Sequence, residues 1–161
     1  MIRQRVLPFK VEATRETLTA HAGLALLGEF AVGLGILRGV DRHLPEPGSG
    51  AGYRPSEYVL PLMLMLNGGG RSMEDTREIR EDGGLREVLG MERVPSADAT
   101  GDWLRRTGAT GGVEGLQRVN RGMLKRGMKY DGHKGYTLDM DATGILAEKE
   151  SAKMTYKGFR G

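Results

Sequence analysis

The run of residues 138–146, Leu-Asp-Met-Asp-Ala-Thr-Gly-Ile-Leu, constrains the fold of this chain more than any other segment. Apolar residues at both ends are typical of a β-strand, and the alternation of side chains in a strand places Asp139 and Asp141 on the same face. Two carboxylates beside an apolar strand are costly to bury unless they bind a cation or accept hydrogen bonds. The run therefore predicts a strand of an α/β domain that carries a metal site, or an edge strand whose carboxylates face water.

Most of the chain before this run has the apolar spacing of helices. Residues 19–40 carry apolar side chains at helical intervals with a break at Gly35, and residues 58–66 are apolar on every side, as in a short buried helix. Further helices are expected at residues 72–80, 85–89, 97–106 and 113–128. Short helices joined by tight turns have the outline of a helix-turn-helix, and they are equally typical of an ordinary all-α core. The pattern predicts a mainly α N-terminal region followed by the first β-strands of an α/β core.

Composition excludes several classes of protein. The 161 residues include no cysteine, which rules out disulfides, thiolate metal sites and a cysteine nucleophile. The longest apolar stretch, residues 22–37, contains Glu29 and is shorter than the roughly 20 residues that cross a bilayer. We expect no membrane span and a cytoplasmic location.

Basic residues are concentrated near the predicted helix at residues 113–128. Leu116, Val119 and Met123 share one face of this helix, and the basic side chains form a stripe on the opposite face without interleaved acids. Such a stripe is often a solvated surface, but it is also the pattern that contacts nucleic-acid phosphates. The candidate phosphate contacts are Arg105, Arg106, Arg118, Arg121, Lys125 and Lys129.

Residues 127–134 have the glycine spacing of a phosphate-binding P-loop but not its chemistry. His133 stands where that loop needs a lysine, no hydroxyl residue follows Lys134, and the stretch ends a helix instead of following a strand. We reject a nucleotide site at this position.

Several motifs together resemble the DDE transposases of bacterial insertion sequences. The resemblance begins at Tyr53 and is carried in order by residues 53–58 (Tyr-Arg-Pro-Ser-Glu-Tyr) with Gly68-Gly69, by 73–82 (Met-Glu-Asp-Thr-Arg-Glu-Ile-Arg-Glu-Asp), by 85–90, by 95–100 (Pro-Ser-Ala-Asp-Ala-Thr), by 103–106 (Trp-Leu-Arg-Arg) and by 138–143. It implies three parts: residues 1–52 as an N-terminal arm and linker, 53–130 as a helical DNA-binding or dimerisation region, and 131–161 as the start of a truncated RNase H-like catalytic domain.

The resemblance also implies a chemistry. Asp141 corresponds to the first catalytic carboxylate and would bind Mg²⁺, whereas Asp139 has no assigned role. The second Asp and the Glu of the family's metal site have no counterparts, so we expect a fragment that is inactive alone. Its implied partner is DNA at the terminal repeats of the element, in a nucleoid-associated location, and a homodimer is left open.

Two alternatives remain open. The first is a DNA-binding or dimerising module without chemistry. The second is a fragment of a haloacid-dehalogenase-like phosphatase, whose Asp-x-Asp-x-Thr motif matches residues 139–143, with Asp139 as the nucleophile and Asp141 as the general acid/base.

Overall fold

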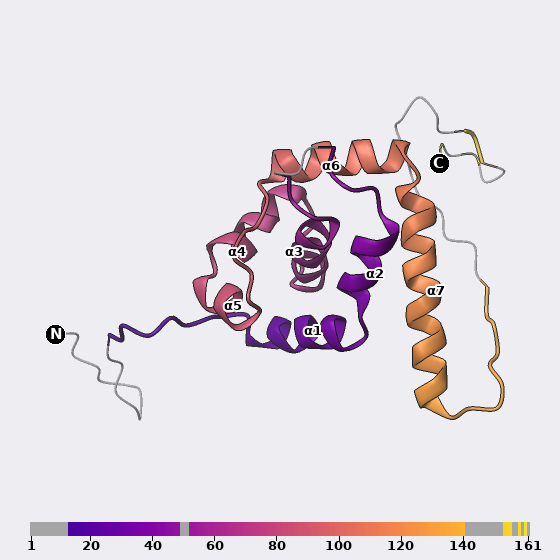
Figure 1. Ribbon diagram of the computed structural model, residues 1–161, viewed down its shortest axis with the longest axis horizontal. Coiled ribbons are helices and arrows are strands. Elements are labelled where there is room, and N and C mark those ends of the chain that lie inside the picture. The colour runs from indigo at the N-terminus through magenta and orange to yellow at the C-terminus, as the bar shows by residue number, and fades with distance from the viewer. Residues whose placement is uncertain (1–12, 49–51, 141–152, 156–157, 159, 161) are drawn as a thin grey trace. The chain divides into compact units, whose positions relative to one another are not determined.

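The computed structural model describes residues 13–48, 52–140, 153–155, 158 and 160. The chain divides into two units, Met1–Tyr130 and Asp131–Gly161. The helices of the described residues belong to the first unit, where the last of them ends at the boundary (Figure 1). In order they are α1 (Ala22–Gly33), α2 (Ile36–His43), α3 (Pro55–Asn67), the 3₁₀ turn η1 (Met73–Asp75), α4 (Thr76–Glu81), α5 (Gly83–Val88), α6 (Ala97–Ala109) and α7 (Gly112–Asp131).

Helix α3 lies at the centre of the first unit, with α1, α2, α4 and α6 around it (Figure 1). Pro55 occupies the first turn, where a helix does not need the missing N–H. The backbone amide of Arg54 donates to Glu57 Oε2 at 2.7 Å, which fixes this end of the helix. Because α3 is apolar all round, it can be buried on several sides at once.

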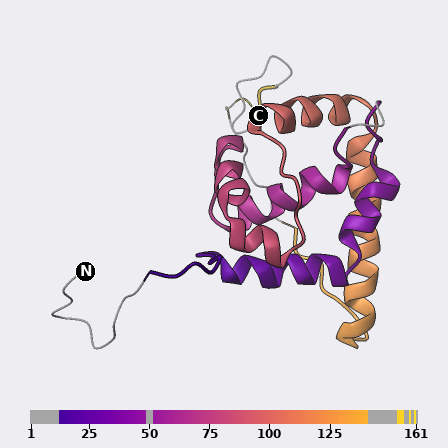
Figure 2. The ribbon, with the colours of Figure 1, turned by 60° about the vertical axis from the view of Figure 1, so that its left-hand side comes forward.

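Two apolar clusters surround α3. The first joins α3 to α4 and α5 through Leu64, Ile79 and Leu85. The second joins α3 to α1, α2 and α6, and its centre is Tyr58, whose ring stacks on Trp103 with centroids 4.7 Å apart and planes 6° apart. Val119 and Met123 of α7 pack against the second cluster. This contact places α7 beside α2 (Figures 1 and 2).

The prediction that β-strands follow the helical region is wrong for the residues that the structure describes. Leu138, Asp139 and Met140 are exposed and pair with no strand, and the β-bridge between Met154 and Arg160 is isolated. A strand needs a neighbour that satisfies its backbone N–H and C=O groups, and side-chain alternation alone does not provide one. The described fold is therefore helical, and an α/β core is not part of it. Asp141 and the rest of the predicted strand lie outside the described residues.

No helix in the described ranges is both long enough and apolar enough to cross a membrane alone. Helices α1 and α2 meet these criteria only when taken together, and they are bent by 59° at their junction.

A candidate nucleic-acid interface

The six predicted DNA contacts lie on two consecutive helices of the first unit. Arg105 and Arg106 are in the last turns of α6, and the other four are on α7. All six are exposed. They are therefore accessible to a large ligand.

The two arginines of α6 already have neighbours. Arg105 Nη2 lies 2.5 Å from Asp102 Oδ1, and both side chains are largely exposed, so the pair contributes little to stability. Arg106 lies near the buried phenol of Tyr58: burial raises the pKa of Tyr58, and the positive charge of Arg106 partly lowers it. Neither residue lines the groove between α2 and α7 that is described below.

The packed face of α7 is set by small residues as well as apolar ones. Gly112 and Gly115 are buried, and Val119 and Met123 reach the core, whereas Leu116 stays 45% exposed. Arg118 precedes Val119 by one residue, which is about 100° around the helix. Arg118 therefore borders the packed face, and the basic stripe begins at the junction with α2 instead of lying wholly opposite the core.

Helices α2 and α7 approach closely through glycines. A Cβ built on Gly39 of α2 would lie 3.5 Å from Val119 Cγ1, in ordinary contact. A Cβ built on Gly115 of α7 would lie 2.5 Å from the backbone oxygen of His43, too close for any side chain. These contacts hold the polar edges of both helices next to each other.

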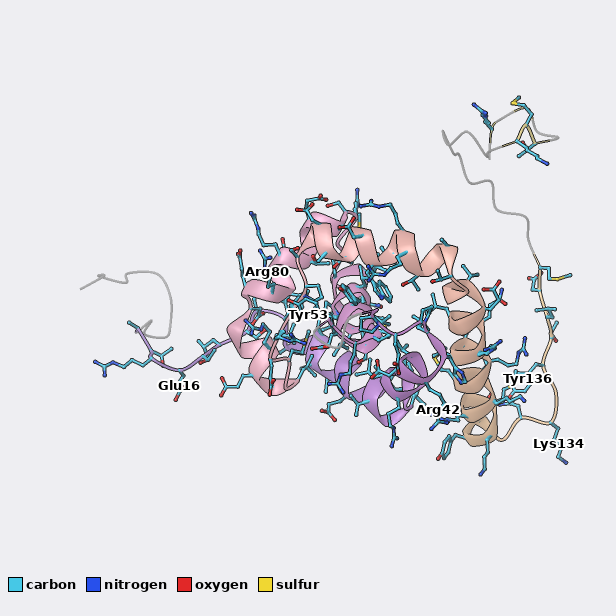
Figure 3. The ribbon with its side chains drawn as sticks, turned by 45° about the horizontal axis from the view of Figure 1, so that its top comes forward. Glu16, Arg42, Tyr53, Arg80, Lys134 and Tyr136 are labelled. Atoms are coloured by element: carbon cyan, nitrogen blue, oxygen red, sulfur yellow. The ribbon has the colours of Figure 1, made fainter. Side chains whose placement is uncertain are left out.

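A groove of about 350 Å³ follows this junction. Its charged or titratable lining is Arg38, Arg42 and His43 from α2 and Arg118 and Arg126 from α7, and no acid lines it. Figure 3 labels Arg42 on α2, next to α7. The groove joins cations from segments far apart in the sequence.

Asp41, the acid nearest in sequence to Arg38 and Arg42, binds the start of α3 instead of these arginines. Asp41 Oδ1 accepts a hydrogen bond from the backbone amide of Ser56, and Asp41 Oδ2 accepts one from the Ser56 hydroxyl, both at 2.8 Å. Its charge is therefore used at the first turn of α3, where a carboxylate is favourable. Arg38 and Arg42 stand one turn apart on α2 without a compensating carboxylate between them.

Arg126 has a structural role in the same groove. Its Nη1 donates to the backbone oxygen of Leu34, which follows the last turn of α1. That helix has no basic residue in its own last turn, so Arg126 supplies the positive charge that a helix C-terminus favours.

The other arginines and lysines of α2 and α7 form what we call the α2–α7 surface: Arg38, Arg42, Arg118, Arg121, Lys125 and Lys129. They take part in none of the ion pairs of the described part of the chain. The pairs are His21–Asp82, Arg54–Glu57, Arg77–Glu81, Arg93–Glu57, Arg105–Asp102 and His133–Asp131. Among the described residues, no carboxylate is paired with Arg38, Arg42, Arg118, Arg121, Lys125 or Lys129. The α2–α7 surface thus carries a positive charge that the described structure leaves uncompensated.

Two other arginines show what a structural arginine looks like in this fold. Arg86 donates to three backbone oxygens, those of Arg80, Met91 and Glu92, and so closes the turn after α5. Arg93 pairs with Glu57 and lies 4.6 Å from the centre of the Tyr53 ring. Their hydrogen bonds are satisfied internally, and we do not include them in the interface.

The predicted Mg²⁺ site cannot be built from the described residues. They contain no group of three or more His, Asp or Glu side chains that could hold a metal ion. Asp139 is exposed, and Asp141, the predicted catalytic and metal-binding residue, lies outside the described ranges. The Mg²⁺ site and the phosphatase alternative both stay predictions.

Comparisons of the chain with protein-family models, with curated proteins and with solved structures find no match.

Arg38, Arg42 and Arg126 are not among the predicted phosphate contacts. The first two precede the region predicted to bind DNA, and Arg126 lies outside the predicted stripe, on the side of α7 that faces α1 and α2. The signal that was available is the spacing of Arg38 and Arg42 at i and i+4, which puts both on one face of a helix.

Proposed function

We propose that this chain is the DNA-binding region of an insertion-sequence transposase and that it holds the terminal DNA of the element through its backbone phosphates. The motif resemblance supports the family, and the structure supports a helical module with a basic surface. In this function the helical unit binds and positions DNA, and performs no chemistry itself.

One observation carries the DNA-binding part of the proposal. Exposed cations of α2 and α7 line a shared groove, others follow along α7, and among the described residues no carboxylate pairs with any of them. Arg121, Lys125 and Lys129 span about 12 Å of the helix axis at 1.5 Å per residue. Regularly spaced cations of this kind neutralise successive phosphates and release their counterions.

The competing explanation is a solvated helix face. A face that only maintains solubility usually mixes both signs of charge, because i, i+4 pairs of opposite sign stabilise an exposed helix. On α4 this is observed, where Arg77 Nε lies 3.8 Å from Glu81 Oε1. The stripe on α7 lacks such pairs among the described residues, which favours a polyanionic partner.

The test is a fluorescence-anisotropy titration of a labelled DNA duplex with the wild-type chain and with charge variants. The double variant Arg121→Glu and Lys125→Glu should bind more than about tenfold more weakly, because it replaces two attractions with two repulsions. The control is Arg77→Glu on α4, another exposed helical arginine, which is far from the stripe in sequence. Equal losses in both variants, or no binding by the wild-type chain at low salt, would contradict the proposal.

A further inference from the structure

We propose that the groove between α2 and α7 is a phosphate-binding site, in which Arg38 and Arg42 of α2 act together with Arg118 of α7 on a single backbone phosphodiester of DNA. This inference rests on the proposed function and adds a specific site to it. It assigns the central contact to a helix that the motif resemblance does not cover.

The first argument is the convergence of like charges. A Cβ built on Gly35 would lie 2.6 Å from Arg126 Nη1 and 3.6 Å from Arg38 Nη2, so both guanidinium groups lie over the same glycine. Like charges held close together repel. An anion in the groove would offset this cost.

The second argument is that, in the described structure, only one of the arginines in the groove has a structural role that accounts for its position. Arg126 is hydrogen-bonded to the end of α1, and this bond explains its position without a ligand. Among the described residues, no carboxylate pairs with Arg42 or Arg118, yet both line the same groove from different helices. Their guanidinium groups offer forked donors of the geometry that phosphate oxygens accept.

The third argument is access. Gly122 lies one turn after Arg118 in the groove wall, and a Cβ built there would meet no atom within 4 Å. The backbone of α7 is therefore open to close approach by a ligand at this point. Gly39 opposite adds no side chain of its own, so the two helices present their arginines around a space that an anionic group can enter.

The choice of a phosphodiester over an isolated anion follows from continuity. Arg118 belongs both to the groove and to the basic stripe, because Arg121 and Lys125 follow it at i+3 and i+7 on the same helix. A ligand seated in the groove and extending along α7 must carry repeated negative charge. DNA meets this requirement, whereas a free phosphate ion would fill only the groove.

The first experiment is a double-mutant cycle in the full chain, with binding of the labelled duplex as the readout. Arg42→Ala and Arg118→Ala should each weaken binding by about tenfold, and the double variant should lose less than the product of the two effects, because both act on one phosphate. Arg42→Lys keeps the charge without the forked donors and should recover only part of the loss. Arg77→Ala is the control and should bind as the wild type does.

A second measurement separates the failure of this site from the failure of DNA binding. Two-dimensional ¹H–¹⁵N spectra of the wild-type chain are recorded with inorganic phosphate and with chloride at equal ionic strength. The amide signals of Gly39 and Gly122 should shift with phosphate, and the shift should disappear in the Arg42→Ala and Arg118→Ala double variant.

The outcomes are distinct. Unchanged DNA affinity in both single variants, with affinity still lost in the variant at residues 121 and 125, would overturn the groove site and leave DNA binding intact. Absence of DNA binding with a phosphate shift at Gly39 and Gly122 would support the groove as an anion site while the proposed function fails. Absence of both would overturn both.

Discussion

At the residue scale, Asp82 shows how a single carboxylate fixes the start of this fold. Its Oδ1 accepts from the backbone amide of Leu85 at 2.8 Å, which caps α5. Its Oδ2 accepts from the Thr19 hydroxyl at 2.6 Å and lies 2.9 Å from His21 Nδ1. The side chain is only 8% exposed, so one acid ties the segment before α1 to α5.

The pKa of Asp82 makes this connection dependent on pH. Burial raises the pKa, but the hydrogen bonds from Thr19, Leu85 and His21 outweigh it and bring the pKa below the ordinary value of 3.8. A carboxyl whose pKa is lowered in the folded state stabilises the fold above its unfolded pKa, and this contribution disappears as the pH falls through the folded pKa.

We therefore expect Asp82→Asn to lower the free energy of unfolding by about 1 to 2 kcal/mol near pH 7. The difference from the wild type should shrink as the pH falls below 3.8, because the wild-type carboxyl then becomes neutral as well. Urea unfolding followed by the fluorescence of Trp103, the single tryptophan, measures both values. A difference that stays constant down to about pH 2 would show that the charge of Asp82 has no part in it.

At the scale of elements, the predicted helices agree with the structure, whereas the predicted strand is not observed in the described residues. The uniformly apolar segment 58–66 predicted a buried helix, which the structure shows as α3. Apolar spacing in residues 19–40 predicted a helix with a break at Gly35, where φ is 67° and the chain turns from α1 into α2. Periodicity works here because a helix satisfies its own backbone hydrogen bonds locally. A strand depends on a neighbouring strand, and Leu138, Asp139 and Met140 pair with none in the described ranges.

The groove between α2 and α7 could not be predicted from local sequence patterns, because it also depends on contacts between distant segments. Arg118 was a candidate from its position on a basic helix, and the i, i+4 spacing of Arg38 and Arg42 puts both on one face of α2. Only the packing of α2 against α7 brings that face next to Arg118. That placement depends on glycines at close contacts, such as Gly115 against the backbone of His43. A glycine in a helix has no periodic signature, so the sequence does not show that α2 and α7 pack together.

This packing predicts opposite effects for two glycines of the same helix. Gly115→Ala should destabilise the protein by about 1 to 3 kcal/mol, because the new Cβ would meet backbone that cannot easily move. Gly127→Ala should stabilise it by about 0.5 to 1 kcal/mol, since that position is exposed, meets nothing within 4 Å and gains helix propensity.

Thermal unfolding by circular dichroism compares these two variants with the wild type. If both alanine variants shift the midpoint in the same direction, α7 does not pack against α2 as the structure shows. Because Gly127 is in the same helix, it controls for any general effect of alanine on α7.

At the scale of the whole molecule, the basic side chains of the described helical unit are unevenly distributed. The formal net charge of the chain is only +3 at pH 7. Some arginines have partners within the protein: Arg86 donates hydrogen bonds to backbone oxygens, and Arg93 pairs with Glu57. The arginines of α2 and α7 that line the groove are exposed to solvent. The distribution of charge, and not its total, is what indicates a polyanionic partner.

The salt dependence of DNA binding by the wild-type chain tests this account most directly. Anisotropy titrations of a labelled duplex at several salt concentrations should show the logarithm of the affinity falling linearly with the logarithm of salt, with a slope of about −0.9 for each phosphate contacted. Arg42 and Arg118 share one phosphate and Arg121 and Lys125 contact one each, so these three phosphate contacts predict a slope of about −3. Removal of Arg42 and Arg118 should make the slope shallower. An affinity that does not respond to salt, or a slope unchanged in that double variant, would contradict it.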